Sequence, residues 1–133
     1  MAESINECTI ETRVRYYEVD RQNAVHHSNY ARYFEMGRTE LLRQNGMDYK
    51  DLEDAGCMLV VAKLDCRFKY PATYDEILKI TTKVTKTDRV RIEHYYKITR
   101  ASDGHLLCDG NTTLVHVNRE GKLQALPEFL GRD

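Results

Sequence analysis

The second half of the chain alternates apolar and polar side chains over four successive segments, and this pattern constrains the fold more than any other feature. A two-residue period is typical of strands with one buried face. Pro71 ends the first segment, and Asp103-Gly104 forms a hairpin turn between the last two. Strands joined by short turns are antiparallel, and their shared apolar face needs a cover. The four segments span residues 58–70, 78–84, 90–98 and 106–117.

One long helix precedes these strands, and it is the only element large enough to cover them. Tyr30, Phe34 and Leu41 recur at helical spacing, and either Ser28 or Asn29 is expected to cap the helix start. We therefore predict a single α+β domain over residues 1–133, in which a five-stranded antiparallel sheet wraps around one long helix. The expected elements before residue 58 are a strand at 9–17, the helix from 28 to about 44, and a short helix at 49–55.

The composition argues against several classes of protein. Lys and Arg total 20 and Asp and Glu total 21, a balance that does not fit a general nucleic-acid binder. No apolar run approaches the ~18 residues of a membrane span, so we expect no stable membrane insertion. The N-terminus shows no basic stretch followed by an apolar one, which favours a cytoplasmic protein. The cysteines form no C-x-x-C pair, so we expect reduced thiols and no metal site.

The loop between the first strand and the long helix carries the densest polar chemistry. Residues 18–30 contain two acids, two histidines and two asparagines, and they end at a helix N-terminus. Unpaired N–H groups at such an end favour developing negative charge. A nearby carboxylate such as Asp20 completes the pair of groups that acyl transfer needs. From the residues alone, an alternative stays open: Asp20 forms a turn and the histidines are surface groups.

Two stretches of the sequence resemble a known family. They run from Val14 to Arg38 and from Cys66 to Leu78, and Asp20 precedes His27 by seven residues. The chain is similar here to the hotdog-fold acyl-CoA thioesterases, in the branch of 4-hydroxybenzoyl-CoA thioesterase and the Tol-Pal-associated acyl-CoA thioesterases. The resemblance implies a hotdog fold and hydrolysis of an acyl-CoA thioester to a free acid and coenzyme A, without a cofactor.

The resemblance also implies roles for individual residues. Asp20 falls on the catalytic aspartate, as nucleophile or general base, and the sequence does not separate these roles. His27 falls on the position whose backbone N–H polarises the thioester carbonyl. The chain departs from the family where Asn23-Ala24 replaces glycine and where His26 replaces an aromatic residue. Besides Asp20 and His27, the expected binding or orienting residues are Tyr16, Asn23, His26 and Tyr30.

Basic residues on the strands and turns are candidates for holding the phosphates of coenzyme A, because Arg and Lys pair well with phosphate. The alternative is that they form a solvated strand face. Two further titratable residues are less specific: Glu35 either faces the site or pairs with a helix arginine, and His94 is expected to be a core or interface histidine. The phosphate candidates are Arg67, Lys69, Arg89 and Arg91.

Two other functions remain open from the sequence. The substrate could be an acyl-carrier-protein thioester, or the chain could be a noncatalytic acyl-CoA sensor. The acyl chain length, the acyl type and the pathway cannot be inferred from the residues. An open sheet edge invites pairing, and the resemblance implies active sites between subunits, so we expect a homodimer or homotetramer.

Overall fold

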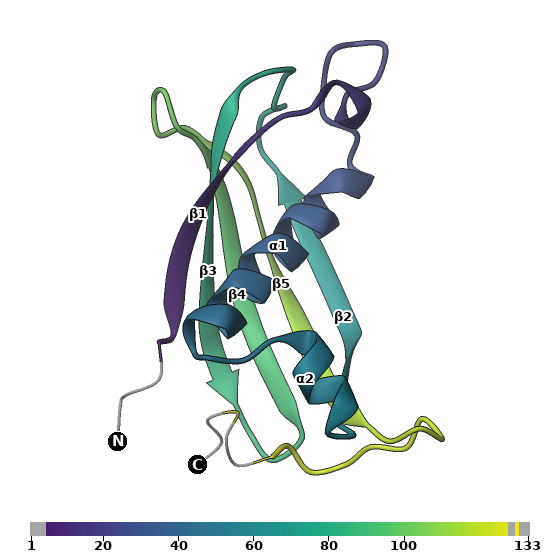
Figure 1. The fold of residues 1–133 in the computed structure, drawn as a ribbon. Helices are drawn as coiled ribbons and strands as arrows, with labels where there is room; N and C mark the ends of the chain where they lie inside the picture. The colour runs from purple at the N-terminus through teal and green to yellow at the C-terminus, as the bar shows by residue number, and fades with distance from the viewer. Residues whose placement is uncertain (1–4, 128–129, 131–133) are drawn as a thin grey trace.

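The structure is a computed structural model and describes residues 5–127 and 130. Five strands form one antiparallel sheet in the order β1-β3-β4-β5-β2, and a long helix lies across its inner face (Figure 1). The predicted α+β architecture is thereby confirmed. The elements are β1 (Glu7–Arg13), the 3-10 helix η1 (Tyr16–Glu18), α1 (Ser28–Gln44), α2 (Tyr49–Asp54), β2 (Met58–Phe68), β3 (Ile77–Thr87), β4 (Arg91–Arg100) and β5 (Leu106–Val117).

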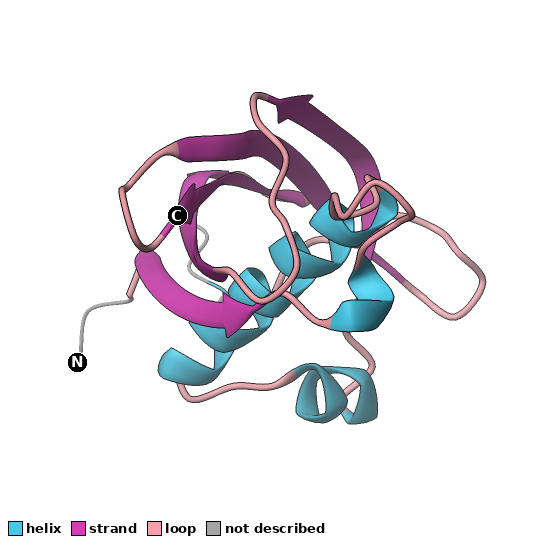
Figure 2. Cartoon of the chain, turned by 90° about the horizontal axis from the view of Figure 1, so that it is seen from above, coloured by secondary structure: helices cyan, strands magenta, loops and turns pink. Residues whose placement is uncertain are grey.

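The sheet curls around α1, as the view from above shows (Figure 2). Phe34 of α1 is fully buried and stacks flat on Tyr96 of β4, with ring centroids 4.3 Å apart. Glycines allow this close approach. A Cβ at Gly37 would overlap the Thr82 hydroxyl, and a Cβ at Gly110 would overlap a backbone carbonyl of β2 and the Phe34 ring. The position of α1 is therefore fixed by contacts that leave no room for adjustment.

The first strand ends four residues earlier than its alternating pattern predicts. Residues 16–18 form η1 instead, and Tyr16 is 77% exposed. The Glu18 carboxylate accepts the backbone N–H of Arg15 at 2.7 Å, so a local side chain replaces a strand partner. The predicted continuation of the strand to Tyr17 is therefore wrong, and the chain turns toward α1.

Apolar side chains on both faces of β2 are left largely uncovered. This strand is an edge of the sheet, and a register shift between Val61 and Lys63 gives it one extra residue. Its large apolar side chains with substantial exposure are Met58, Val60, Val61, Leu64 and Phe68. Within the described residues, no helix is long and apolar enough to cross a bilayer.

All four cysteines are free thiols. Cys8, Cys57 and Cys108 are buried, and Cys66 is half-buried. Burial is the main reason that the pKa of each thiol is raised, and it brings the pKa of Cys108 to about 12. These side chains therefore act as small apolar groups in the folded protein.

Candidate active site

Asp20 lies in a tight turn that holds its carboxylate through backbone groups. Its Oδ1 accepts the N–H of Gln22 at 2.8 Å and that of Ala24 at 3.4 Å. Its own N–H donates to the Ala24 carbonyl, and Asn23 donates to the Asp20 carbonyl. Asn23 has a positive φ of 61°, a conformation that asparagine tolerates better than most residues. The departure from glycine at this position is therefore compatible with the turn.

A second set of bonds joins this loop to the segment between β2 and β3. Val25 donates to the Ala72 carbonyl at 2.8 Å, and the Asn23 Oδ1 accepts the Tyr74 N–H at 3.2 Å. The Asn23 Oδ1 is thus bonded to Tyr74, and among the described residues the Asn23 side chain has no hydrogen bond to Asp20, so its orienting role stays a prediction. Tyr16 packs edge-on against Tyr74, with ring centroids 5.6 Å apart, and lies outside the site.

The start of α1 leaves one backbone donor available. The N–H groups of Asn29 and Tyr30 bond to the carbonyls of His26 and His27, and His26 itself donates to the Glu18 carbonyl. Among the described residues, the His27 N–H has no hydrogen-bond partner. It therefore stands where the helix dipole favours an oxyanion.

The rings of the two histidines lie against each other, tilted, at this helix end. Their ring centroids are 4.1 Å apart with a 31° angle between planes. The His26 Nδ1 accepts the Ser28 N–H at 3.2 Å, and it also contacts the Ser28 hydroxyl at 2.8 Å. Since Nδ1 is an acceptor, the proton of the neutral ring lies on Nε2. The helix begins at Ser28 with His27 at the N-cap position, so the predicted cap at Ser28 or Asn29 is wrong.

One cavity of about 340 Å³ brings these groups together. It contains five of the predicted site residues, including Lys69, and two aromatic residues that the sequence analysis did not single out. Phe68 and Tyr70 are each 55% exposed and end the apolar face of the 58–70 segment, a signal that could have placed them beside the site. The cavity is lined by Asp20, Val25, His26, His27, Tyr30, Phe68, Lys69, Tyr70 and Pro71.

Tyr30 forms the inner wall of the cavity. Its ring meets Phe68 edge-on at a centroid distance of 5.3 Å, and its hydroxyl accepts the Ala72 N–H at 3.4 Å. Burial raises the pKa of Tyr30, so its hydroxyl stays protonated. The cavity therefore combines a carboxylate and a free amide with an aromatic wall.

Comparison with known proteins identifies the family. Residues 14–132 match the family model described as the thioesterase-like superfamily. The chain belongs to this superfamily. It is 33% identical over 116 residues to a putative esterase of Aquifex aeolicus, covering 87% of this chain and 88% of the relative. It is 29% identical to the acyl-CoA thioester hydrolase YbgC of Escherichia coli O157:H7, covering 89% and 88%.

Solved structures confirm the hotdog fold of this thioesterase-like chain. The DHNA-CoA thioesterase from Staphylococcus aureus superposes with a TM-score of 0.83 at 30% identity, covering 90% of this chain and 79% of that one. The resemblance predicted from the two sequence stretches is thereby confirmed.

The four candidate phosphate residues lie in different parts of this thioesterase-like chain. Lys69 alone of the four lines the cavity. Arg89 and Arg91 lie at the β3–β4 hairpin, the end of the sheet opposite the site, because β3 runs away from the Asp20 loop for 11 residues (Figure 1). Arg91 forms an ion pair there with Asp88 at 2.9 Å. The four phosphate candidates therefore do not lie together within a single chain.

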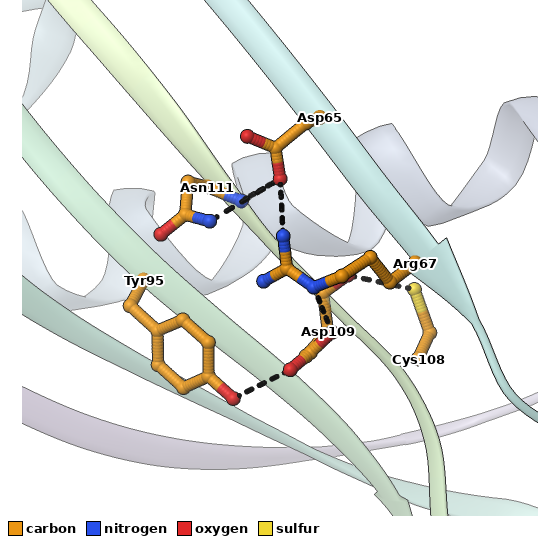
Figure 3. A network of polar contacts seen from close by, with 6 residues as sticks. All are labelled: Asp65, Arg67, Tyr95, Cys108, Asp109 and Asn111. Atoms are coloured by element: carbon orange, nitrogen blue, oxygen red, sulfur yellow. Dashed lines mark hydrogen bonds and ion pairs between the residues drawn. The ribbon is translucent and has the colours of Figure 1, made fainter.

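Arg67 belongs to a separate polar network that lies across β2, β4 and β5 (Figure 3). It bonds to Asp109 at 2.8 Å and to Asp65 at 3.1 Å, and Tyr95 donates to Asp109 at 2.9 Å. Although burial opposes the change, the bonds from Arg67 and Tyr95 lower the pKa of Asp109. Arg67 is thus already paired with carboxylates, which compete with any phosphate.

Two other titratable residues lie away from the cavity. Glu35 is exposed and pairs with Arg38 at 3.8 Å, as the structural alternative predicts. His94 is buried, and among the described residues its Nδ1 has no partner. Burial, and then the charge of Arg38, lowers the pKa of His94 from 6.5 to about 4.

His94 should make the fold sensitive to acid. An unfolded histidine binds a proton below about pH 6.5, whereas the folded protein resists protonation until about pH 4. The free energy of unfolding should therefore fall as pH drops through this range, by up to ~1.4 kcal/mol per pH unit from this group. The free energy of unfolding measured in urea should lack this pH dependence in His94→Gln. The matched control, His105→Gln, replaces an exposed histidine and should retain it. Parallel curves for wild type and His94→Gln would contradict the assignment.

Proposed function

We propose that this protein hydrolyses an acyl-CoA thioester to a free acid and coenzyme A. The observation that supports the proposal is the shared cavity, which Asp20 and His27 both line, together with a His27 N–H that has no hydrogen-bond partner among the described residues. The names of the relatives support the substrate class, since one is an acyl-CoA thioester hydrolase and another a DHNA-CoA thioesterase. Neither group needs a metal or a redox cofactor for this reaction.

The proposed mechanism has two routes that the same geometry serves. In both, the thioester oxygen accepts the His27 N–H, which stabilises the developing oxyanion. In the nucleophilic route, Asp20 forms a C–O bond to the carbonyl carbon, the C–S bond breaks, and water then hydrolyses the anhydride. In the general-base route, Asp20 takes a proton from the water that attacks the carbonyl carbon, the C–S bond breaks, and the departing thiolate takes up that proton to give coenzyme A. We propose that the His27 ring helps to orient the water.

Substitution of Asp20 tests the proposal directly. Asp20→Asn keeps the shape of the turn but removes the nucleophile or base, so kcat for thiol release should fall by at least ~10²-fold. The matched control is Asp75→Asn, which makes the same chemical change in an exposed residue outside the cavity and should keep wild-type turnover. Thiol release by Asp20→Asn at the wild-type rate would remove Asp20 from the mechanism.

The same measurement separates the alternative functions. A noncatalytic acyl-CoA sensor would bind the substrate without releasing thiol. An acyl-carrier-protein thioesterase would release thiol faster from carrier-bound acyl groups than from acyl-CoA. A panel of both substrate classes therefore distinguishes the three functions and also reports the preferred acyl group.

Lys69 is the residue that we propose to contact a phosphate of coenzyme A. It lines the cavity and is exposed, whereas Arg67 and Arg91 are paired with carboxylates. Contacts to the nucleotide end act equally in the ground and transition states, so they affect KM rather than kcat.

Lys69→Ala should raise KM for acyl-CoA severalfold at nearly constant kcat, and the wild-type KM should rise with salt. A short thioester without the nucleotide should be insensitive to both changes. Arg91→Ala serves as the matched control and should leave KM unchanged if each chain binds its own substrate. A KM unmoved in Lys69→Ala would show that this lysine is only a solvated side chain.

We further propose that a second copy of the chain covers the edge strand β2. Val60 and Leu64 are 40% and 46% exposed on this edge strand. A monomer would therefore leave large apolar side chains in contact with water along an unpaired strand edge. Phe68 continues the same strand into the cavity, so the second copy would also enclose the substrate site. We also propose that residues 1–133 act as one domain in the cytoplasm.

Light scattering should give at least the mass of a dimer for the wild-type protein. Leu64→Lys places a charge on the proposed interface and should shift the mass toward the monomer, with a parallel loss of turnover. Ile5→Lys makes a similar change beside β1, at the opposite edge of the sheet, and should remain dimeric. A wild-type monomer with full activity at the assay concentration would contradict the proposal.

A further inference from the structure

A buried carboxylate lies two residues before Asp20. Glu18 is only 5% exposed, and its Oε1 accepts the Tyr33 hydroxyl at 3.0 Å and the Arg15 N–H at 2.7 Å. The Arg15 guanidinium lies 3.5 Å from Oε2. A buried charge is costly unless such donors surround it. The sequence pattern did not predict a role for Glu18, because an acid in a polar loop is usually solvated.

Tyr33 is the part of this arrangement that belongs to α1. It is almost fully buried in the second turn of the helix. Burial, followed by the hydrogen bond and charge of Glu18, raises the pKa of Tyr33. The Tyr33 hydroxyl therefore stays protonated and is available as a donor to Glu18.

The backbone of Glu18 makes a second link to the same helix. Its carbonyl accepts the His26 N–H at 2.9 Å and the Asn29 Nδ2 at 2.9 Å. This bond occupies the His26 N–H, so the next amide, that of His27, is the one left for a substrate. Among the described residues, these contacts of Glu18 are the hydrogen bonds that join the 16–25 loop to the body of α1.

We propose that Glu18, held by Tyr33 and Asn29, is a positioning residue that fixes the distance between the Asp20 carboxylate and the His27 N–H. The inference rests on the proposed function. The bonds to Ala72 and Tyr74 fix the loop to the sheet side, whereas Glu18 fixes it to the helix that carries the oxyanion donor. A displacement of ~1 Å between reacting groups can lower a rate by ~10²-fold.

Removal of one hydroxyl tests this role. Tyr33→Phe loses the donor to Glu18 but keeps the ring, and kcat for acyl-CoA should fall by ~10-fold or more while KM changes by less than ~2-fold. Tyr96→Phe is the matched control, because it removes an equally buried hydroxyl bonded to Thr112 at 2.6 Å, away from the loop. It should lower the unfolding midpoint similarly but leave kcat unchanged.

A conservative substitution and a double-mutant cycle complete the experiment. Glu18→Gln keeps an oxygen acceptor and should retain kcat within ~3-fold, whereas Glu18→Ala should lose at least as much as Tyr33→Phe. In an Asp20→Asn background, the effect of Tyr33→Phe on kcat should shrink to less than ~2-fold. Tyr33 affects the rate only by positioning the Asp20 carboxylate, and that carboxylate is absent from this background.

The outcomes distinguish a failure of the proposed function from a failure of the positioning role. If the wild type releases no thiol from acyl-CoA, the proposed function fails. If Asp20→Asn retains wild-type turnover, Asp20 is removed from the mechanism and the positioning role fails with it. If Asp20→Asn is inactive but Tyr33→Phe matches wild type, the positioning role alone is overturned. An undiminished Tyr33→Phe effect in the Asp20→Asn background, or an equal kcat loss in Tyr96→Phe, also overturns it. If Tyr33→Phe does not fold, Asn29→Ala replaces it under the same criteria.

Discussion

A single helix must cover the inner face of a five-stranded sheet, and the rest of the structure depends on how closely it can approach. Gly37 on the helix and Gly110 on the sheet remove the Cβ atoms that would hold the two apart. Phe34 fills the space beside them and stacks on Tyr96. Because this packing leaves little freedom along the helix axis, the first turn of α1 has one location relative to the strands.

That fixed helix end turns a flexible segment into a defined site. The loop before it is held on one side by the segment between β2 and β3, through Val25, and on the other by the helix, through Glu18. The turn around Asp20 supplies its own bonds to the carboxylate. The position of the loop is thus determined by backbone hydrogen bonds and by buried side chains, which vary less than contacts between exposed side chains.

Sequence periodicity predicted the elements that bury an apolar face, since such faces leave a regular pattern. It failed at residues 14–17, where the Glu18 carboxylate accepts the Arg15 N–H and the strand ends. A hydrogen bond between a side chain and the backbone leaves no trace in the alternation of apolar and polar residues. Spacing and resemblance placed Asp20 and His27 in one site, because both are close in the chain. Sequence reasoning grouped Arg89 with the candidates near the site. Arg89 instead follows the 11-residue strand β3, whose length places it at the far end of the sheet.

The state of the cysteines has a practical consequence for studying the enzyme in solution. A thiol reacts with disulfide reagents through its thiolate, and burial disfavours the thiolate at all four positions. The native protein should therefore react slowly with a chromogenic disulfide, whereas free coenzyme A reacts at once. Rapid labelling of the protein itself would then report loss of the fold, and the same reagent becomes a probe of structural integrity.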